Sequence, residues 1–193
     1  MKAIETVYNG YKFRSRLEAR WAVFFDALGV EWEYEKQGFD LDEAGKYLPD
    51  FWLPGLDCWI EIKGSEPTES EQDKGRLLGE HTGKRVVCFF GRIEFFDKQN
   101  SNSGYLLAPY WDNLYFWCVC PDCGAIDIRF EGRSDRMPCK KLGCPRHSGN
   151  QDREHTYNHP RIMFAILAAR QARFEYGESG FSRSEEETWP AVE

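Results

Sequence analysis

Two acids and a lysine stand on neighbouring short segments of this chain. Asp50 follows Pro49, and a single residue separates Glu61 from Lys63. Carboxylates supply the hard oxygen ligands that Mg²⁺ or Mn²⁺ prefers, and Mg²⁺ is often bound through one or two of them plus substrate phosphate. Such a cation stabilises the negative charge that builds up in phosphodiester hydrolysis, and a nearby lysine complements it. The spacing therefore predicts a metal-dependent nuclease site.

The local pattern also predicts how these residues are brought together. Strands are expected over 46–53 and 57–63, joined by a tight Pro-Gly turn. Side chains alternate across a strand, so Glu61 and Lys63 share one face of the second strand. Pairing of the two strands as a hairpin would place Asp50 beside Glu61.

A helix precedes the hairpin and offers a third acid. Ser15 and Glu18 have the spacing of a capping box, and apolar residues recur at helical spacing until Gly29. Glu18 has two interpretations: it is a further metal ligand, or it reaches back to cap the amide of Ser15.

The order of elements predicts an α/β fold. After the first helix come a strand over 31–35, the hairpin, a helix over 71–81 and a buried strand over 85–90. The expected core is thus helix, three strands, helix, strand, with a mixed sheet flanked by helices. A last helix is expected over 161–176, between Pro160 and Gly177.

This order, together with Pro-Asp and Glu-X-Lys, resembles the PD-(D/E)XK nuclease superfamily and its restriction-endonuclease-like core. The resemblance covers residues 8–91. It implies that Asp50 and Glu61 are metal ligands and that Lys63 positions or activates the attacking water. Many members add an acid from the first helix, which would be Glu18 here. The implied Mg²⁺ ligands are Glu18, Asp50 and Glu61.

The combination of acids looks most like phage-type junction-resolving endonucleases and the endonuclease subunits of some transposition systems. The expected function is a Mg²⁺-dependent DNA endonuclease, structure-selective or nicking. Two alternatives stay open: a non-catalytic DNA-binding or adaptor protein on the same scaffold, and an RNA endonuclease. Symmetric cutting of two strands would require two sites, which a homodimer would provide.

Seven cysteines point to a second, structural metal site. Without a signal peptide, short Cys spacing favours metal binding over disulfides, and four thiolates suit a closed tetrahedral Zn²⁺ site. The segment resembles a zinc ribbon, although the second pair is spaced more widely than usual. The expected ligands are Cys120, Cys123, Cys139 and Cys144. His147 is the substitute ligand, and Cys118 a more distant one.

Basic residues crowd the loop that carries the second cysteine pair. The chain as a whole has a net charge of −7, which argues against indiscriminate binding of nucleic acid. A local basic patch would supply phosphate contacts nonetheless. The predicted DNA-binding residues are Arg133, Arg136, Lys140, Lys141 and Arg146.

Composition suggests how the chain is divided. We expect a nuclease core over 1–96, a connector with aromatic-rich strands over 97–115, a zinc-ribbon-like module over 116–150, a C-terminal helix over 151–177 and an acidic tail over 178–193, the tail disordered. No apolar run approaches the roughly 20 residues of a membrane span. The expected location is the cytoplasm of a bacterium or a phage-infected host.

Overall fold

The computed structural model describes residues 4–94, 104–108, 114–120, 122–130, 144 and 159–174. In these ranges the chain is a mixed α/β structure with three α-helices: α1 (Arg16–Leu28), α2 (Glu69–Thr82) and α3 (Pro160–Gln171). A seven-stranded sheet has the order β11 (Ile126–Phe130), β10 (Leu114–Val119), β9 (Gly104–Ala108), β8 (Arg85–Phe90), β7 (Cys58–Lys63), β6 (Phe51–Leu53) and β3 (Glu33–Tyr34). Two small ladders stand apart: β1 (Thr6–Tyr8) with β2 (Tyr11–Phe13), and β4 (Phe39–Asp40) with β5 (Lys46–Tyr47).

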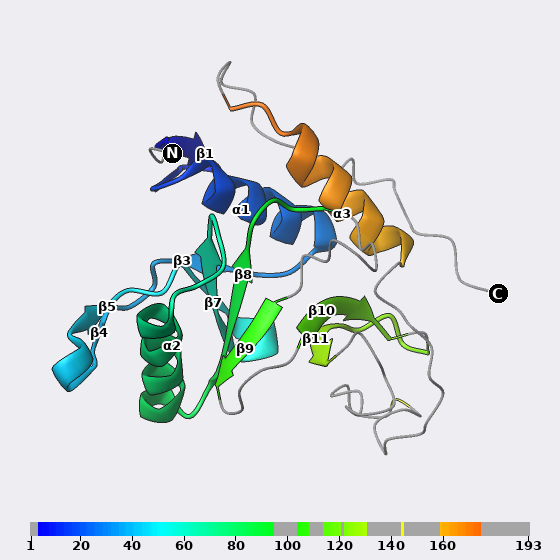
Figure 1. Ribbon diagram of the computed structural model, residues 1–193. Helices are drawn as coiled ribbons and strands as arrows, with labels where there is room; N and C mark the ends of the chain where they lie inside the picture. Colours follow the sequence, from blue (N-terminus) through cyan, green and yellow to red (C-terminus); the bar gives the residue numbers. More distant parts are fainter. Residues whose placement is uncertain are drawn as a thin grey trace.

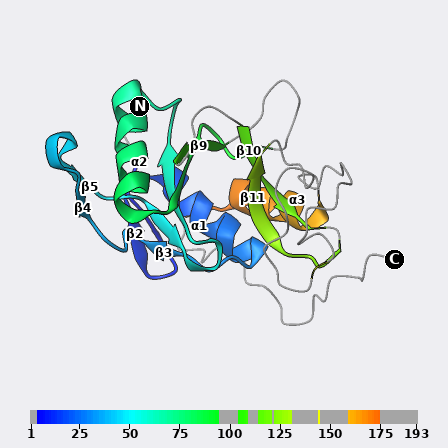
Figure 2. The same cartoon turned by 90° about the horizontal axis from the view of Figure 1, so that it is seen from below.

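Helices cover the sheet on both faces (Figures 1 and 2). One hydrophobic cluster joins α1 and α3 to alternate residues of β7, including Ile60 and Ile62. A second cluster joins α2 to the opposite face through Leu78, Trp59 and Val86. The alternation predicted for the strand over 57–63 is therefore present.

The first helix forms for the reasons that its sequence suggests. Ser15 is the N-cap, and its hydroxyl oxygen accepts a hydrogen bond of 3.2 Å from the Glu18 amide. Gly29 ends the helix in the left-handed conformation, with φ of 78°, which glycine adopts without steric cost. Trp21, Phe24 and other apolar side chains of the helix are buried against the sheet.

The predicted order of core elements is present as α1, β3, β6, β7, α2 and β8. Strands β7 and β8 are parallel, with Lys63 opposite Phe90, and α2 forms the connection between them. The second helix begins at Glu69, two residues before its predicted start, because Thr68 and Glu71 form a capping box. The buried strand over 85–90 is confirmed as β8.

The prediction of one continuous strand over 46–53 is wrong. β5 ends at Tyr47 and pairs with β4, whereas β6 begins at Phe51 and pairs with β7. Pro49 lies between them, and proline has no N–H to donate to a ladder. The turn after β6 is a short 3₁₀ helix, η2 (Pro54–Leu56), rather than a two-residue turn.

Residues 38–48 therefore form a separate arm. It consists of β4, the 3₁₀ helix η1 (Asp42–Ala44) and β5, and it extends from the edge of the main sheet (Figure 1).

The C-terminal helix is shorter than predicted and ends at Gln171 rather than at residue 176. It packs against α1 in the opposite direction: near the start of α3, the Arg161 guanidinium donates a hydrogen bond of 3.2 Å to the carbonyl of Leu28, at the end of α1. The hairpin of β10 and β11 extends the same sheet as β7 and β8.

Parts of the predicted connector (97–103 and 109–113) and the acidic tail lie outside the described residues. No helix in the described ranges is both long and apolar enough to cross a membrane.

Candidate functional site

Asp50 lies directly before β6 and is 2% exposed. Its Oδ2 accepts a hydrogen bond of 2.7 Å from the Ile62 amide of β7, which fixes the carboxylate against the neighbouring strand. Its Oδ1 accepts a hydrogen bond from the guanidinium of Arg14. The antiparallel pairing of β6 with β7 thus brings Asp50 to the end of β7 where Glu61 and Lys63 lie.

Glu61 is the second buried acid, at 4% exposure. Its Oε1 lies 2.7 Å from Nζ of Lys63, and Nζ is also 3.3 Å from Oε1 of Glu71 on α2. Its Oε2 is buried and has no hydrogen-bond partner in the described structure. An unpaired buried carboxylate oxygen is costly, and a bound cation would satisfy it.

Glu18 extends from the first turn of α1 and is also buried. Its Oε1 accepts 2.7 Å from the Ser15 hydroxyl, and its Oε2 accepts 3.1 Å from the Arg14 amide and 2.6 Å from the Tyr34 hydroxyl. The amide that it caps is therefore that of Arg14, one residue before Ser15. A carboxylate offers about four acceptor positions, so these three bonds leave room for a further contact.

The charges of the acids act on one another. Burial, then the nearby charges of Glu61 and Glu18, raise the pKa of Asp50 well above its usual value, against the opposing effect of the Ile62 amide and Arg14. Repulsion between neighbouring carboxylates is the condition that a divalent cation relieves. By their donor atoms, Asp50 and Glu61 fit Mg²⁺ or Mn²⁺.

Lys63 stays charged beside these acids. Burial acts to lower its pKa, but the charge of Glu61 and the hydrogen bond to it outweigh burial, so the pKa of Lys63 is raised. An ammonium group is therefore present at the site at neutral pH.

Three further residues belong to the site and were not assigned to it from the sequence. Arg14 bridges Asp50 and Glu35, with Nε 2.8 Å from the Glu35 carboxylate. Tyr34 holds Glu18, and Tyr47 lies close enough to Glu61 that burial and the Glu61 charge raise the pKa of its hydroxyl. The sequence signal for Arg14 is that it stands in a basic segment with Lys12, Arg16 and Arg20.

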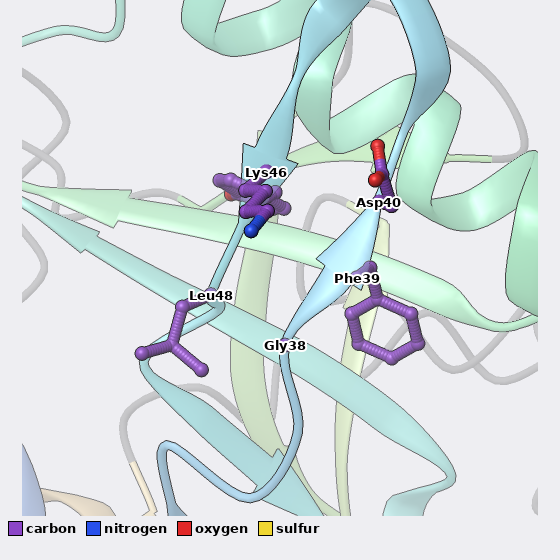
Figure 3. Close-up of a pocket in the computed structure, with 6 residues that line it drawn as sticks. Gly38, Phe39, Asp40, Lys46 and Leu48 are labelled. Atoms are coloured by element: carbon purple, nitrogen blue, oxygen red, sulfur yellow. The ribbon is translucent and has the colours of Figure 1, made fainter.

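A pocket of about 420 Å³ adjoins the acids through Tyr47, one of its lining residues. It lies in the arm of β4 and β5, where Phe39 and Leu48 come from the two facing segments (Figure 3).

A separate group of thiols lies at the end of the β10–β11 hairpin. The ligand atoms of Cys120, Cys123 and Cys144 all lie within 4.8 Å of one another, and Sγ of Cys120 is 3.7 Å from Sγ of Cys144. This group could hold a metal ion. Among the described residues, no other group of three or more acids, histidines or cysteines has its ligand atoms this close together. The carboxylates of Glu18, Asp50 and Glu61 therefore lie farther apart than these thiols.

The surroundings of Cys120 favour the thiolate form of its side chain, which is the form that binds metals. Burial acts to raise its pKa, but the amides of Cys123 and Asp122 and the thiols of Cys123 and Cys144 outweigh burial, so the pKa is lowered. Cys118 is not part of this group, because its thiol points to the carbonyl of Asp127 at 3.5 Å.

The remaining predicted residues of the module lie outside the described residues. They are Cys139, His147, Arg133, Arg136, Lys140, Lys141 and Arg146.

Comparisons with known proteins give no relative: no family model, curated protein or solved structure matches this chain.

Proposed function

We propose that the chain is a Mg²⁺-dependent DNA endonuclease with a restriction-endonuclease-like core of the PD-(D/E)XK kind. The observation that carries the proposal is the pair of buried carboxylates, Asp50 and Glu61, beside the charged Lys63 at one end of the sheet. Burying two like charges destabilises a fold unless opposite charges, from side chains or a bound cation, offset them. The unpaired Oε2 of Glu61 supports a cation at this position.

Each residue has a distinct part in the reaction. Asp50 and Glu61, with Glu18 as a further ligand, would hold the divalent cation. When bound, this cation stabilises charge on the phosphoryl oxygens and makes a bound water more acidic. The raised pKa of Lys63 makes its ammonium a holder of developing negative charge rather than a proton acceptor.

The environment of Lys63 also orients it. Glu61 and Glu71 hold Nζ from two elements, β7 and α2, so the ammonium stays at the end of the sheet where substrate phosphate would arrive. Holding a catalytic group in place in this way makes a large contribution to the rate acceleration of phosphoryl transfer.

We also propose that Zn²⁺ is the metal of the thiol group, as a structural ion. Cys120, Cys123 and Cys144 would supply three ligands, and Cys139 or His147 the fourth.

The test compares wild type, Lys63→Ala and Lys84→Ala with Mg²⁺ on supercoiled plasmid, linear duplex, single-stranded DNA, a four-way junction and RNA. Lys84 is a matched control, because it is also ion-paired to an acid, Asp57, at 2.8 Å but lies at the opposite end of β8. We expect Lys63→Ala to lose about a hundredfold or more in rate and Lys84→Ala to cleave as wild type does.

Equal cleavage by wild type and Lys63→Ala, or no cleavage of any substrate, would contradict the proposed nuclease activity. The second outcome, with DNA binding retained, would favour a non-catalytic DNA-binding protein. Cleavage of RNA alone would favour the RNA endonuclease.

A further inference from the structure

A second pocket, of about 440 Å³, is lined mainly by arginines. Its residues are Arg16, Leu17, Arg20, Arg92, Ile93, Glu94 and Arg170. Four arginines and one glutamate give this pocket a formal charge of +3, within a chain whose net charge is −7.

The pocket is formed by three elements that are distant in sequence. Arg16 and Arg20 lie one turn apart in α1, Arg92 follows β8, and Arg170 is in the last turn of α3. Antiparallel packing of α1 against α3 brings the end of α3 to the start of α1. The chain leaving β8 passes beside these helices (Figure 1).

The composition of the pocket favours a phosphate ligand. Guanidinium groups are planar forks that bind phosphate oxygens in pairs, and four of them line this one pocket. The N-terminal end of α1, a helix of 13 residues, carries a partial positive charge at the same place.

This pocket and the acidic site lie at the same end of the sheet. Lys63 pairs with Phe90, and the Gly91 amide donates to the Lys63 carbonyl at 2.9 Å, so the segment bearing Arg92 continues from the site. Glu18 lies between Arg16 and Arg20 on α1, and at about 100° per residue it faces away from them. One helix of roughly 10–12 Å diameter thus separates the acids from the arginines.

We propose that the four-arginine pocket binds phosphate groups of a nucleic acid strand, while another phosphate of the same strand, more than one nucleotide away, occupies the acidic site. The inference rests on the proposed function for its substrate class and extends it with a second contact point. The strand crosses the start of α1, with one phosphate at Lys63 and another among the arginines. The phosphate is either a terminal monoester or a backbone diester.

The test measures binding without cleavage, in a Lys63→Ala background with EDTA. The pocket variant is Arg92→Gln with Arg170→Gln, and the matched control is Lys84→Gln with Arg76→Gln, which removes the same charge from the surface of α2 and from just before the start of β8. Arg92 and Arg170 are exposed, and Arg76 and Lys84 form surface ion pairs, so the melting curves of these proteins should nearly coincide; Arg92→Gln alone serves if the double variant unfolds early. Fluorescence anisotropy is recorded with a labelled single-stranded DNA that carries a 5′-phosphate or a 5′-hydroxyl.

We expect the pocket variant to bind at least tenfold more weakly than the control. The slope of log affinity against log salt should fall by about 1.4, as for two lost phosphate contacts on a single strand. A loss confined to the 5′-phosphate probe identifies a terminal phosphate as the ligand, and a loss with both probes identifies the backbone.

Equal affinity of the pocket and control variants would overturn the inference, as would equally tight binding of a polyglutamate peptide. The result is separable from that of the cleavage assay. If binding depends on the arginines but no substrate is cleaved, the phosphate pocket is supported and the proposed nuclease activity is contradicted. If substrate is cleaved but binding does not depend on the arginines, the nuclease activity is supported and the phosphate pocket is contradicted.

Discussion

Arg14 places a positive charge beside the buried carboxylate of Asp50. Its guanidinium donates a hydrogen bond to Asp50 and forms an ion pair with Glu35, although its side chain is 54% exposed. Lys63 compensates Glu61 in the same way. Asp50 and Glu61 thus each have a basic partner from the chain itself, whereas Glu18 is held by hydroxyl and amide donors.

We predict that Arg14→Gln binds Mn²⁺ more tightly than wild type does. The guanidinium and the metal compete for Asp50, so removing this pair, of which only the Arg14 side is exposed and which is worth about 1 kcal/mol, should raise metal affinity roughly fivefold. Glu18→Gln should weaken binding, because it removes a negative charge beside Asp50. Isothermal titration with Mn²⁺, without substrate, measures both changes.

Arg76→Gln is the control for this titration, since Arg76 pairs with Glu80 on the surface of α2. If Arg14→Gln bound Mn²⁺ no better than the control, the guanidinium would not be a competitor. If Glu18→Gln bound Mn²⁺ as tightly as wild type does, Glu18 would be a capping residue and not a metal ligand.

Short elements position these residues, and each is ended by a recognisable feature. Pro49 separates β5 from β6, which allows Tyr47 to belong to the arm while Asp50 faces β7. The β10–β11 hairpin ends in the thiol group, with the Cys120 amide donating to the carbonyl of Ala125 at 2.8 Å. A metal at that point would tie Cys144 to the end of the hairpin.

We predict one bound Zn²⁺ per chain and its loss in Cys123→Ser. Three thiols within 4.8 Å favour a tetrahedral ion, and removing one ligand should abolish tight binding. Native mass spectrometry counts the metal, and a chelator should lower the melting temperature of the wild type because the ion binds the folded state.

Cys118→Ser is the matched control, because Cys118 lies two residues before Cys120 but its thiol bonds to a backbone carbonyl. It should retain the metal. A wild-type mass without metal would refute the site.

At the scale of the described molecule, an aromatic core joins α1 to β6 and β10. The Phe25 ring lies 5.2 Å from that of Phe51 and 5.8 Å from that of Trp117, centroid to centroid. Phe51 follows Asp50, and Trp117 is on β10, so α1 links the acidic site to the hairpin with the thiols. The two sites should therefore unfold together.

We predict that Phe25→Ala lowers the free energy of unfolding by about 3–5 kcal/mol, because it opens a cavity at a fully buried position. Urea titration followed by tryptophan fluorescence and by thiol reactivity should give coincident transitions. Val7→Ala, at a residue 66% exposed, should cost less than about 0.5 kcal/mol. Separate transitions would mean that the hairpin is an independent unit.

Elements with local signals could be predicted from the amino-acid sequence. The Ser15 cap, the Gly29 stop and the alternation of β7 predicted α1 and the shared face of Glu61 and Lys63, because caps and periodicity depend on near neighbours. The short spacing of Cys120 and Cys123 likewise indicated a thiol group.

Contacts between residues far apart in the chain could not be predicted and became known from the fold. Arg14 reaches Asp50 across 36 positions, and the four arginines of the second pocket come from three elements. Such contacts depend on strand order and helix packing, which arise from burial of the whole core and leave no periodic trace in the chain. Pro49, by contrast, is a local signal for the break between β5 and β6, which the prediction of one strand over 46–53 missed.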